Sequence, residues 1–237
     1  YRPERGGYDE HVTVGLRPPL LSACDTTAGQ LVIDLPAGLA VGRTIHEVFE
    51  SVDATAVPLQ EEIQRVIEEK TSSGMLRHYR ERLNTMVYET LTTPLGTPFG
   101  DCRLIDIAPS QSMPEMGFEM GLGGHLQNIK VASIGKILRQ FIDVEDPLAR
   151  YADILCGPAF DIPVRGILTG SVDAVLGLPG SKTENPRLAI CDYKSNRLHT
   201  LGASDPLQAY APERLMEVMA HHHYPLQAIL YLSLIHI

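Results

Sequence analysis

Hydrophobic residues recur at helical spacing in several stretches of the chain. After Gly42, the apolar side chains at positions 45, 48, 49 and 52 follow the i, i+3, i+4, i+7 pattern that places them on one face of a helix. The same spacing predicts further helices over residues 60–69, 79–91, 130–142, 212–221 and 225–235. The chain is therefore expected to contain many amphipathic helices.

Extended segments are also expected. Residues 162–178, "IPVRGILTGSVDAVLGL", are rich in β-branched side chains and predict a strand, and the glycines within it suit a closely approached backbone. A turn-rich loop over residues 179–186 leads to the apolar run "LAIC", so the two strands are expected to form an antiparallel hairpin. The segments "CRLIDIA" (102–108) and "EMGFEMGL" (115–122) are shorter candidates, the second with a helical alternative. Together these patterns predict a mixed α/β chain.

Composition and length set the expected organisation. Hydrophobic residues make up 44% of 237 residues, which is enough for a sizeable core, and 21% charged residues do not indicate disorder. The first forty residues are rich in proline and glycine and show no sustained period, so residues 1–40 are expected to be a leading segment or linker. Residues 41–237 are expected to form one domain.

The formal net charge of −9 narrows the possible partners. Evenly spread negative charge repels a nucleic-acid backbone, which argues against an independent DNA-binding protein. It does not argue against a metal-dependent nuclease, because such a site needs carboxylates. A nuclease of this charge would have to gather its basic residues in one groove or use a positive channel built by a partner.

The cysteines and the apolar runs exclude further classes. The four cysteines Cys24, Cys102, Cys156 and Cys191 lie far apart with no CxxC pair, which argues against zinc-ribbon and iron–sulfur sites and predicts reduced, mostly buried thiols. No run approaches the roughly eighteen apolar residues of a membrane span, and no basic-then-apolar leader opens the chain. A cytoplasmic location without membrane contact is expected.

Two acids and a lysine carry the candidate chemistry. In an extended chain, Asp192 and Lys194 share one face while Tyr193 takes the other, and Asp173 is expected on the neighbouring antiparallel strand. Carboxylate oxygens suit Mg²⁺, which polarises a phosphate and activates water, and an ammonium group offsets the charge that develops. A salt bridge at the rim of the sheet is the alternative for Asp192 and Lys194. An unpaired carboxylate in the apolar strand at Asp173 is costly, so a cation is its simplest partner.

Four motifs in order resemble a known family. They are "GRTIHEVFE" (42–50), "LTGSVDAVL" (168–176), "ICDYKSNRL" (190–198) and "HYPLQAILY" (223–231). In sequence and order they resemble the C-terminal nuclease domain of the RecB subunit of the RecBCD helicase–nuclease, which belongs to the PD-(D/E)xK superfamily. The resemblance covers about residues 35–231, and its DYKSN string is specific to RecB- and AddA-type nucleases. It implies a restriction-endonuclease-like α/β (α+β) fold with a central mixed sheet flanked by helices.

The resemblance also implies roles for individual residues. His46, Asp173 and Asp192 correspond to metal ligands, and Lys194 corresponds to the catalytic lysine, with Asp173 and Asp192 also counted as catalytic. Without the resemblance, His46 beside an apolar helical stripe would be read as a half-buried histidine. The adjacent histidines 221–223 point in different directions on a helix and are expected at the surface or in a loop, with at most one near the site.

Three further residues are expected to border the active site. Gln227 and Tyr231, four residues apart and so on one helix face, match the family's Q-x-x-x-Y helix. Glu115 lies where the family carries an acid ahead of a core strand. The alternatives are that Gln227 satisfies a backbone group and that Tyr231 is a plain core residue.

The expected function is Mg²⁺-dependent hydrolysis of DNA phosphodiester bonds, as exonuclease or endonuclease, in double-strand break processing and recombinational repair. Mn²⁺ or Ca²⁺ is expected to occupy the same site. No P-loop is present, because "GLPGSKT" and "IGKIL" both miss its pattern, so no ATP site is expected on this chain. The resemblance implies DNA, the helicase part of the same subunit and RecC- and RecD-like subunits as partners.

Two alternatives remain open, and one segment departs from the family. The alternatives are a catalytically inactive nuclease-like module that binds DNA or acts as a scaffold, and another PD-(D/E)xK nuclease of the restriction or CRISPR-associated type. The last residues, "LSLIHI" (232–237), do not match the helix and strand that follow in the family. They predict either a truncated domain or an end that is not native to the gene.

Overall fold

The computed structural model describes residues 35–122, 129–180, 187–199 and 204–235. The chain divides into two compact units. Unit 1 comprises Tyr1–Glu115 and Asp173–Pro212, and unit 2 comprises Met116–Val172 and Glu213–Ile237. The linker expected over residues 1–40 lies almost wholly outside the described residues. It stays a prediction, as does a single domain from 41 to 237.

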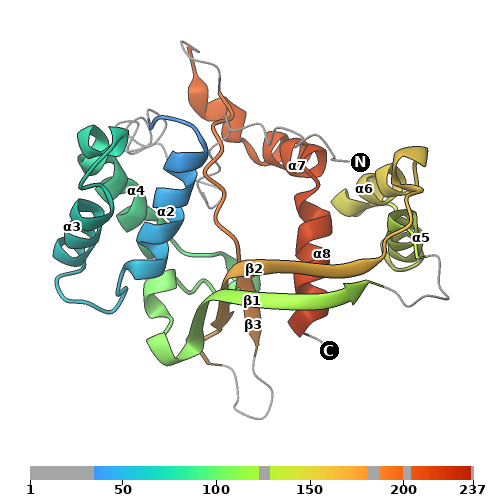
Figure 1. Cartoon of the computed structure of the whole chain (residues 1–237), viewed down its shortest axis with the longest axis horizontal. Helices are drawn as coiled ribbons and strands as arrows, with labels where there is room; N and C mark the ends of the chain where they lie inside the picture. Colours follow the sequence, from blue (N-terminus) through green and yellow to red (C-terminus); the bar gives the residue numbers. More distant parts are fainter. Residues whose placement is uncertain (1–34, 123–128, 181–186, 200–203, 236–237) are drawn as a thin grey trace. The chain divides into compact units, whose positions relative to one another are not determined.

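Three helices build most of unit 1 and pack in sequence order, α2 on α3 and α3 on α4 (Figure 1). Their buried side chains recur at the predicted spacing, and Val48, Ile63 and Leu83 are fully enclosed. The helix expected after Gly42 begins slightly earlier and ends one residue before Val52, which turns into extended backbone. The bounds are α2 (Leu39–Ser51), α3 (Leu59–Lys70) and α4 (Arg80–Thr92).

The strand expected over residues 102–108 is wrong. Leu104–Asp106 forms a 3-10 helix, η3, in which the Asp106 carboxylate accepts hydrogen bonds from the backbone N–H and the guanidinium of Arg103. Leu104 and Ile107 are both buried, so the apolar side chains of this segment pack into the core from a tight turn and not from a strand. The other 3-10 segments of unit 1 are η1 (Met75–Tyr79), η2 (Thr97–Phe99), η4 (Pro109–Gln111) and η6 (Pro206–Tyr210).

A three-stranded sheet in the order β1-β2-β3 confirms the mixed α/β class (Figure 1). The strands are β1 (Ser112–Leu122), β2 (Gly166–Gly177) and β3 (Leu188–Cys191). The predicted hairpin is confirmed, because β2 and β3 pair antiparallel, with Ala174 opposite Cys191 and Val175 opposite Ile190. Residues 115–122 belong to a strand rather than to the alternative helix. The residues 181–186 of the loop that connects β2 to β3 lie outside the described part of the chain.

The described part of unit 2 contains four helices. The bounds are α5 (Val131–Phe141), α6 (Pro147–Leu155), α7 (Pro212–His221, of which Pro212 falls in unit 1) and α8 (Tyr224–Ile235), with the 3-10 segment η5 (Pro158–Phe160). Three of the helices were predicted, and α6 was not. Helix α5 packs closely on α6 at Gly135, where a Cβ atom would lie 2.8 Å from the backbone oxygen of Ala152. Glycine is therefore required at this helix crossing.

The cysteines depart in part from expectation. Cys191 is buried, Cys102 is half-buried and Cys156 is exposed, so a prediction of mostly buried thiols is wrong for the three described cysteines. Burial raises the pKa of the Cys191 thiol to about 11, which keeps it protonated at neutral pH. Among the described helices, none has the length and apolar character needed to cross a membrane.

Candidate functional site

One face of helix α2 carries the first predicted ligand. Gly42, His46 and Phe49 lie at i, i+4 and i+7 and therefore share this face. Gly42 admits a close approach, since a Cβ atom there would lie 2.7 Å from Oγ of Ser195. The Phe49 ring stacks on the Tyr193 ring at a centroid distance of 4.4 Å and an interplanar angle of 6°. The helix is thus held against residues 193–195 on both sides of His46.

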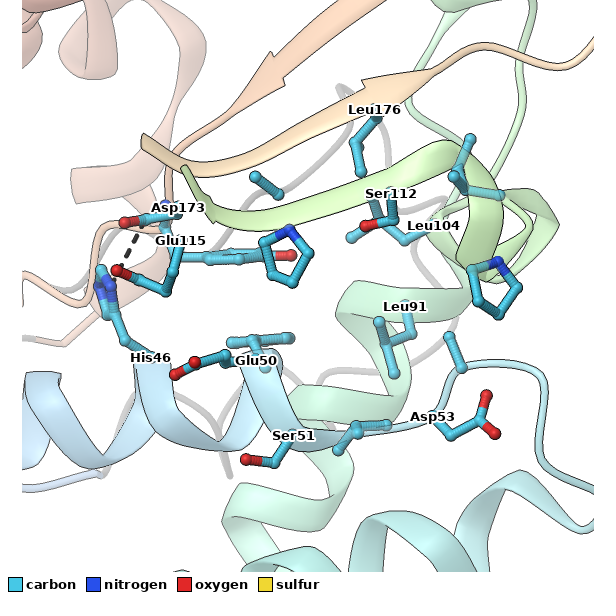
Figure 2. A pocket seen from close by; sticks show the side chains of 18 of the residues that line it. His46, Glu50, Ser51, Asp53, Leu91, Leu104, Ser112, Glu115, Asp173 and Leu176 are labelled. Atoms are coloured by element: carbon cyan, nitrogen blue, oxygen red, sulfur yellow. Dashed lines mark hydrogen bonds and ion pairs between the residues drawn. The ribbon is translucent and has the colours of Figure 1, made fainter. Parts of the chain in front are cut away.

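His46 and Asp173 meet directly. Nδ1 of His46 lies 3.4 Å from Oδ2 of Asp173, although the two residues come from distant parts of the sequence (Figure 2). The same carboxylate oxygen accepts a 2.6 Å hydrogen bond from the backbone N–H of Tyr193. The ring of His46 also lies edge-on to the Tyr193 ring, with centroids 6.1 Å apart. Asp173 is therefore oriented from two sides by groups that donate hydrogen bonds.

Asp192 and Lys194 follow the end of β3 and form an ion pair. The contact agrees with the prediction that the two side chains share one face, while Tyr193 packs against the core with Phe49. The β2–β3 pairing ends with Ala174 opposite Cys191, so Asp173 and Asp192 lie next to this last pair. The charge of Asp173 acts on Asp192, so the two acids lie close together.

The surroundings move the pKa values of the two acids in opposite directions. Burial raises the pKa of Asp192 more than the attraction of Lys194 lowers it. Burial acts in the same sense on Asp173, but the hydrogen bond and charge of His46 and the Tyr193 N–H outweigh it, so the pKa of Asp173 is lowered. The hydrogen bond to Asp173 raises the pKa of His46, against the effect of burial. The group thus holds two carboxylates of unequal acidity, each facing a basic side chain.

Glu115 lies at the edge of the same group. It is an exposed residue of β1 and adopts a left-handed backbone with φ of 46°, a conformation that is uncommon for residues other than glycine. Figure 2 shows its side chain beside His46 and Asp173, and all three line one pocket together with Glu50 of α2. The structure thus brings Glu115 to the pocket that Asp173 lines, and its role at the active-site border stays a prediction.

Gln227 and Tyr231 lie in unit 2. They share one face of α8 as predicted, and the Gln227 side-chain amide donates a 2.6 Å hydrogen bond to the Tyr231 hydroxyl. That hydroxyl donates in turn to the backbone oxygen of Ser171 in β2, at 3.0 Å, and the Tyr231 ring contacts Phe118 edge-on. Tyr231 therefore ties α8 to strand β2 within unit 2, and a role at the active-site border stays a prediction.

The three adjacent histidines occupy the end of α7 and the turn before α8. His223 adopts a left-handed backbone, with φ of 59°, and its Nδ1 lies 3.2 Å from the hydroxyl of Tyr151. His222 stacks on Tyr224. The turn position agrees with the expectation of a surface or loop location, and these contacts belong to the packing of unit 2.

The carboxylates of Asp173 and Asp192 and the imidazole of His46 are of the chemical types that bind a hard divalent cation. Two partly buried carboxylates, Asp173 and Asp192, lie at the end of the β2–β3 pairing, and the His46 imidazole reaches the first of them. Oxygen donors of this type suit Mg²⁺, Mn²⁺ and Ca²⁺. Within the described residues, however, no three histidine, cysteine or acidic side chains enclose a metal site as they stand, since Asp192 faces Lys194. The sharing of one ion by Asp173, Asp192 and His46 stays a prediction.

Three features of the site were not predicted from the sequence. The Phe49–Tyr193 stack and the Gly42–Ser195 approach determine where His46 lies, yet neither was singled out. The available signal was the spacing within "GRTIHEVFE", which places Gly42 and Phe49 one turn before and one turn after His46. Glu50, four residues after His46, was also passed over.

Comparison with known proteins gives one consistent result. The chain is 32% identical over 244 residues to the RecBCD enzyme subunit RecB of Mycobacterium tuberculosis, a match that covers 99% of this chain and 21% of that protein. The subunit of the same name from Mycolicibacterium smegmatis is 32% identical over 85% of the chain, and that from Haemophilus influenzae is 24% identical over 97%. No family model matches the chain.

The chain spans about a fifth of the length of the relatives it matches, between 16% and 21%. Their shared name agrees with the resemblance indicated by the four motifs, and the alignment extends well beyond those motifs. The family resemblance is confirmed: along nearly its whole length, this chain is a homologue of one part of the RecB subunit of RecBCD enzymes.

Proposed function

We propose that the chain is a metal-dependent deoxyribonuclease domain of a RecBCD-type enzyme, which hydrolyses DNA phosphodiester bonds during double-strand break processing and recombinational repair. The observation that carries the proposal is the group formed by Asp173, Asp192, Lys194 and His46 at the end of the β2–β3 pairing. Homology to RecB subunits supports the same assignment.

Asp173, Asp192 and His46 would hold the cation, which supplies Lewis-acid polarisation of the phosphate and a water of lowered pKa. The Tyr193 N–H and His46 fix the orientation of the Asp173 carboxylate. Lys194, only 21% exposed, is placed to exchange its contact with Asp192 for a phosphate oxygen or for the attacking water. None of these steps needs a covalent nucleophile, and the thiol of Cys191, the residue before Asp192, is protonated and buried.

We further propose that the domain works inside a larger assembly. The relatives are named as subunits of the RecBCD enzyme, and the chain spans a fifth of their length. With a net charge of −9, the chain as a whole repels a nucleic-acid backbone. Helicase parts of the same subunit and RecC- and RecD-like subunits would deliver the strand, in the cytoplasm.

The test is cleavage of end-labelled linear DNA by the purified chain, with and without Mg²⁺ or Mn²⁺. Cleavage is expected only with the metal, and Lys194→Ala and Asp173→Asn should each lower the rate at least about a hundredfold, as the loss of a transition-state contact does. Lys136→Ala, at an exposed position of α5, is the matched control and should retain full activity. Far-UV circular dichroism should show that Lys194→Ala still folds.

Two results would contradict the proposal. Cleavage that persists in EDTA would exclude the metal mechanism. Metal-dependent cleavage that survives Lys194→Ala would leave Lys194 as a rim salt bridge. A chain that folds, binds DNA and never cuts it under either metal would instead match the alternative of an inactive nuclease-like module.

A further inference from the structure

A pocket of about 350 Å³ opens in unit 1 beside the carboxylate group. His46 and Asp173 form one end, and the pocket runs between α2 on one side and β1 with β2 on the other, as far as Asp53 (Figure 2). Its volume lies at the lower end of the range of sites for small organic groups, roughly 300–1,000 Å³.

The charges around the pocket decide what can enter. Glu50, Asp53, Glu115 and Asp173 contribute carboxylates, and neither lysine nor arginine is among the residues that line it. A phosphate or another anion deep in this pocket would be repelled at short range by Glu50 and Asp53, the two carboxylates beyond the catalytic end. The anionic part of a ligand is therefore excluded, and groups that donate hydrogen bonds to carboxylates are favoured.

The walls favour a flat group with apolar faces and a polar edge. Apolar side chains, including Phe49, Leu91 and Leu176, line the pocket, while Ser112, Glu50 and Glu115 add polar atoms (Figure 2). The Asp53 carboxylate accepts hydrogen bonds from Thr55. A nucleobase has this character. Adenine and cytosine carry exocyclic amino groups that donate hydrogen bonds, whereas thymine presents a carbonyl oxygen and a methyl group at the corresponding edge. Inside a duplex these edges are paired, so only an unpaired base can enter.

We infer that this pocket binds an unpaired nucleobase of the strand whose phosphate lies at Asp173 and Asp192, with a preference for adenine and cytosine over thymine. The inference rests on the proposed nuclease function for the placement of the strand. It adds a binding site for the base and a reason for single-stranded ends to be the better substrate. The neutral base would enter the pocket, while the charged phosphate of the same nucleotide stays at Asp173 and Asp192.

The first experiment uses nucleosides, which carry no phosphate and need no metal. The ¹⁵N-labelled chain is titrated with deoxyadenosine, deoxycytidine and thymidine in EDTA, and amide shifts are followed by NMR. Saturable shifts at residues 50–54 and at Ser112 are expected for the first two nucleosides, with binding about tenfold weaker for thymidine, as the loss of one hydrogen bond to a charged group implies. Equal binding of all three nucleosides, or no shifts at these positions, would overturn the inference.

Variants show whether binding occurs in the pocket. Ser112→Phe should fill the pocket and abolish the shifts, whereas Met113→Phe, at the next and 56% exposed position of β1, should leave them unchanged. If Ser112→Phe unfolds the chain, Glu50→Ala removes one acceptor without filling space and should erase most of the preference over thymidine. An unchanged preference in Glu50→Ala would contradict the assigned role of that carboxylate.

The second experiment measures cleavage of single-stranded oligonucleotides that carry one abasic nucleotide at successive positions. An abasic nucleotide beside the scissile phosphate should slow cutting about tenfold, and the same change further away should have no effect. Equal rates on all substrates would overturn the inference while leaving the nuclease function intact. A chain that binds nucleosides in the pocket but cuts no DNA would instead contradict the proposed function alone.

Discussion

The contact that places His46 can be tested with a double-mutant cycle on Phe49 and Tyr193. Both rings are partly or mostly buried against the core of unit 1, and they stack at 4.4 Å with almost parallel planes. Stacked pairs of this kind contribute about 0.5–1.5 kcal/mol beyond the area they bury. Replacing Phe49 or Tyr193 with leucine keeps an apolar side chain and removes the stacking, so each single variant is expected to lose about 1–2 kcal/mol.

The coupling between the two changes is the decisive quantity. The double variant Phe49→Leu/Tyr193→Leu should be destabilised by less than the sum of the singles, with a coupling of about 1 kcal/mol. Urea unfolding is followed by far-UV circular dichroism, because the chain contains no tryptophan. Phe99→Leu, at a 38% exposed ring outside the stack, is the control and should be additive with Tyr193→Leu.

The same variants report on the site. The backbone N–H of Tyr193 still reaches Asp173 in Tyr193→Leu, so Asp173 keeps one of its two hydrogen bonds. His46 loses its packing, and a displacement of about 1 Å in a positioned group can cost a hundredfold in rate. A coupling below about 0.3 kcal/mol, or full activity in both single variants, would show that the stack does not position the helix.

Two further predictions concern stability away from the site. Gly135→Ala should destabilise unit 2 by about 1–3 kcal/mol in thermal unfolding, because the new Cβ would lie 2.8 Å from backbone and side-chain atoms of α6. This clash outweighs the roughly 1 kcal/mol of helix propensity that alanine gains over glycine. An unchanged or raised melting temperature would contradict the close crossing. Asp106→Asn should cost about 0.5 kcal/mol at pH 7, a modest value because the pair with Arg103 is partly exposed. The hydrogen bonds from Arg103 hold the pKa of Asp106 below its ordinary value of 3.8, so this contribution is fully present above that pH and is lost as the pH falls through the lower folded value. Urea unfolding at pH 7 and near pH 2.5 should show the difference shrinking, and a constant difference would refute the assignment.

Sequence pattern alone determined the local geometry of this protein. The faces of α2, α3 and α4 follow from the 3.6-residue period of their apolar side chains, because burying such a stripe is the main source of helix stability in proteins. The alternation of an extended chain similarly placed Asp192 and Lys194 on one face, and four-residue spacing placed Gln227 over Tyr231. These relations involve neighbours along the chain, so they need no knowledge of the rest of the fold.

Tertiary packing decided the remainder. The 3.4 Å contact of His46 with Asp173, the stacking of Phe49 on Tyr193 and the arrival of Glu115 at the same pocket join residues from α2, the hairpin and β1. Packing also converted residues 104–106 from an expected strand into a turn. Sequence pattern cannot give such contacts, because the distance between remote residues depends on how the whole core closes around them, including the close approach that Gly42 allows.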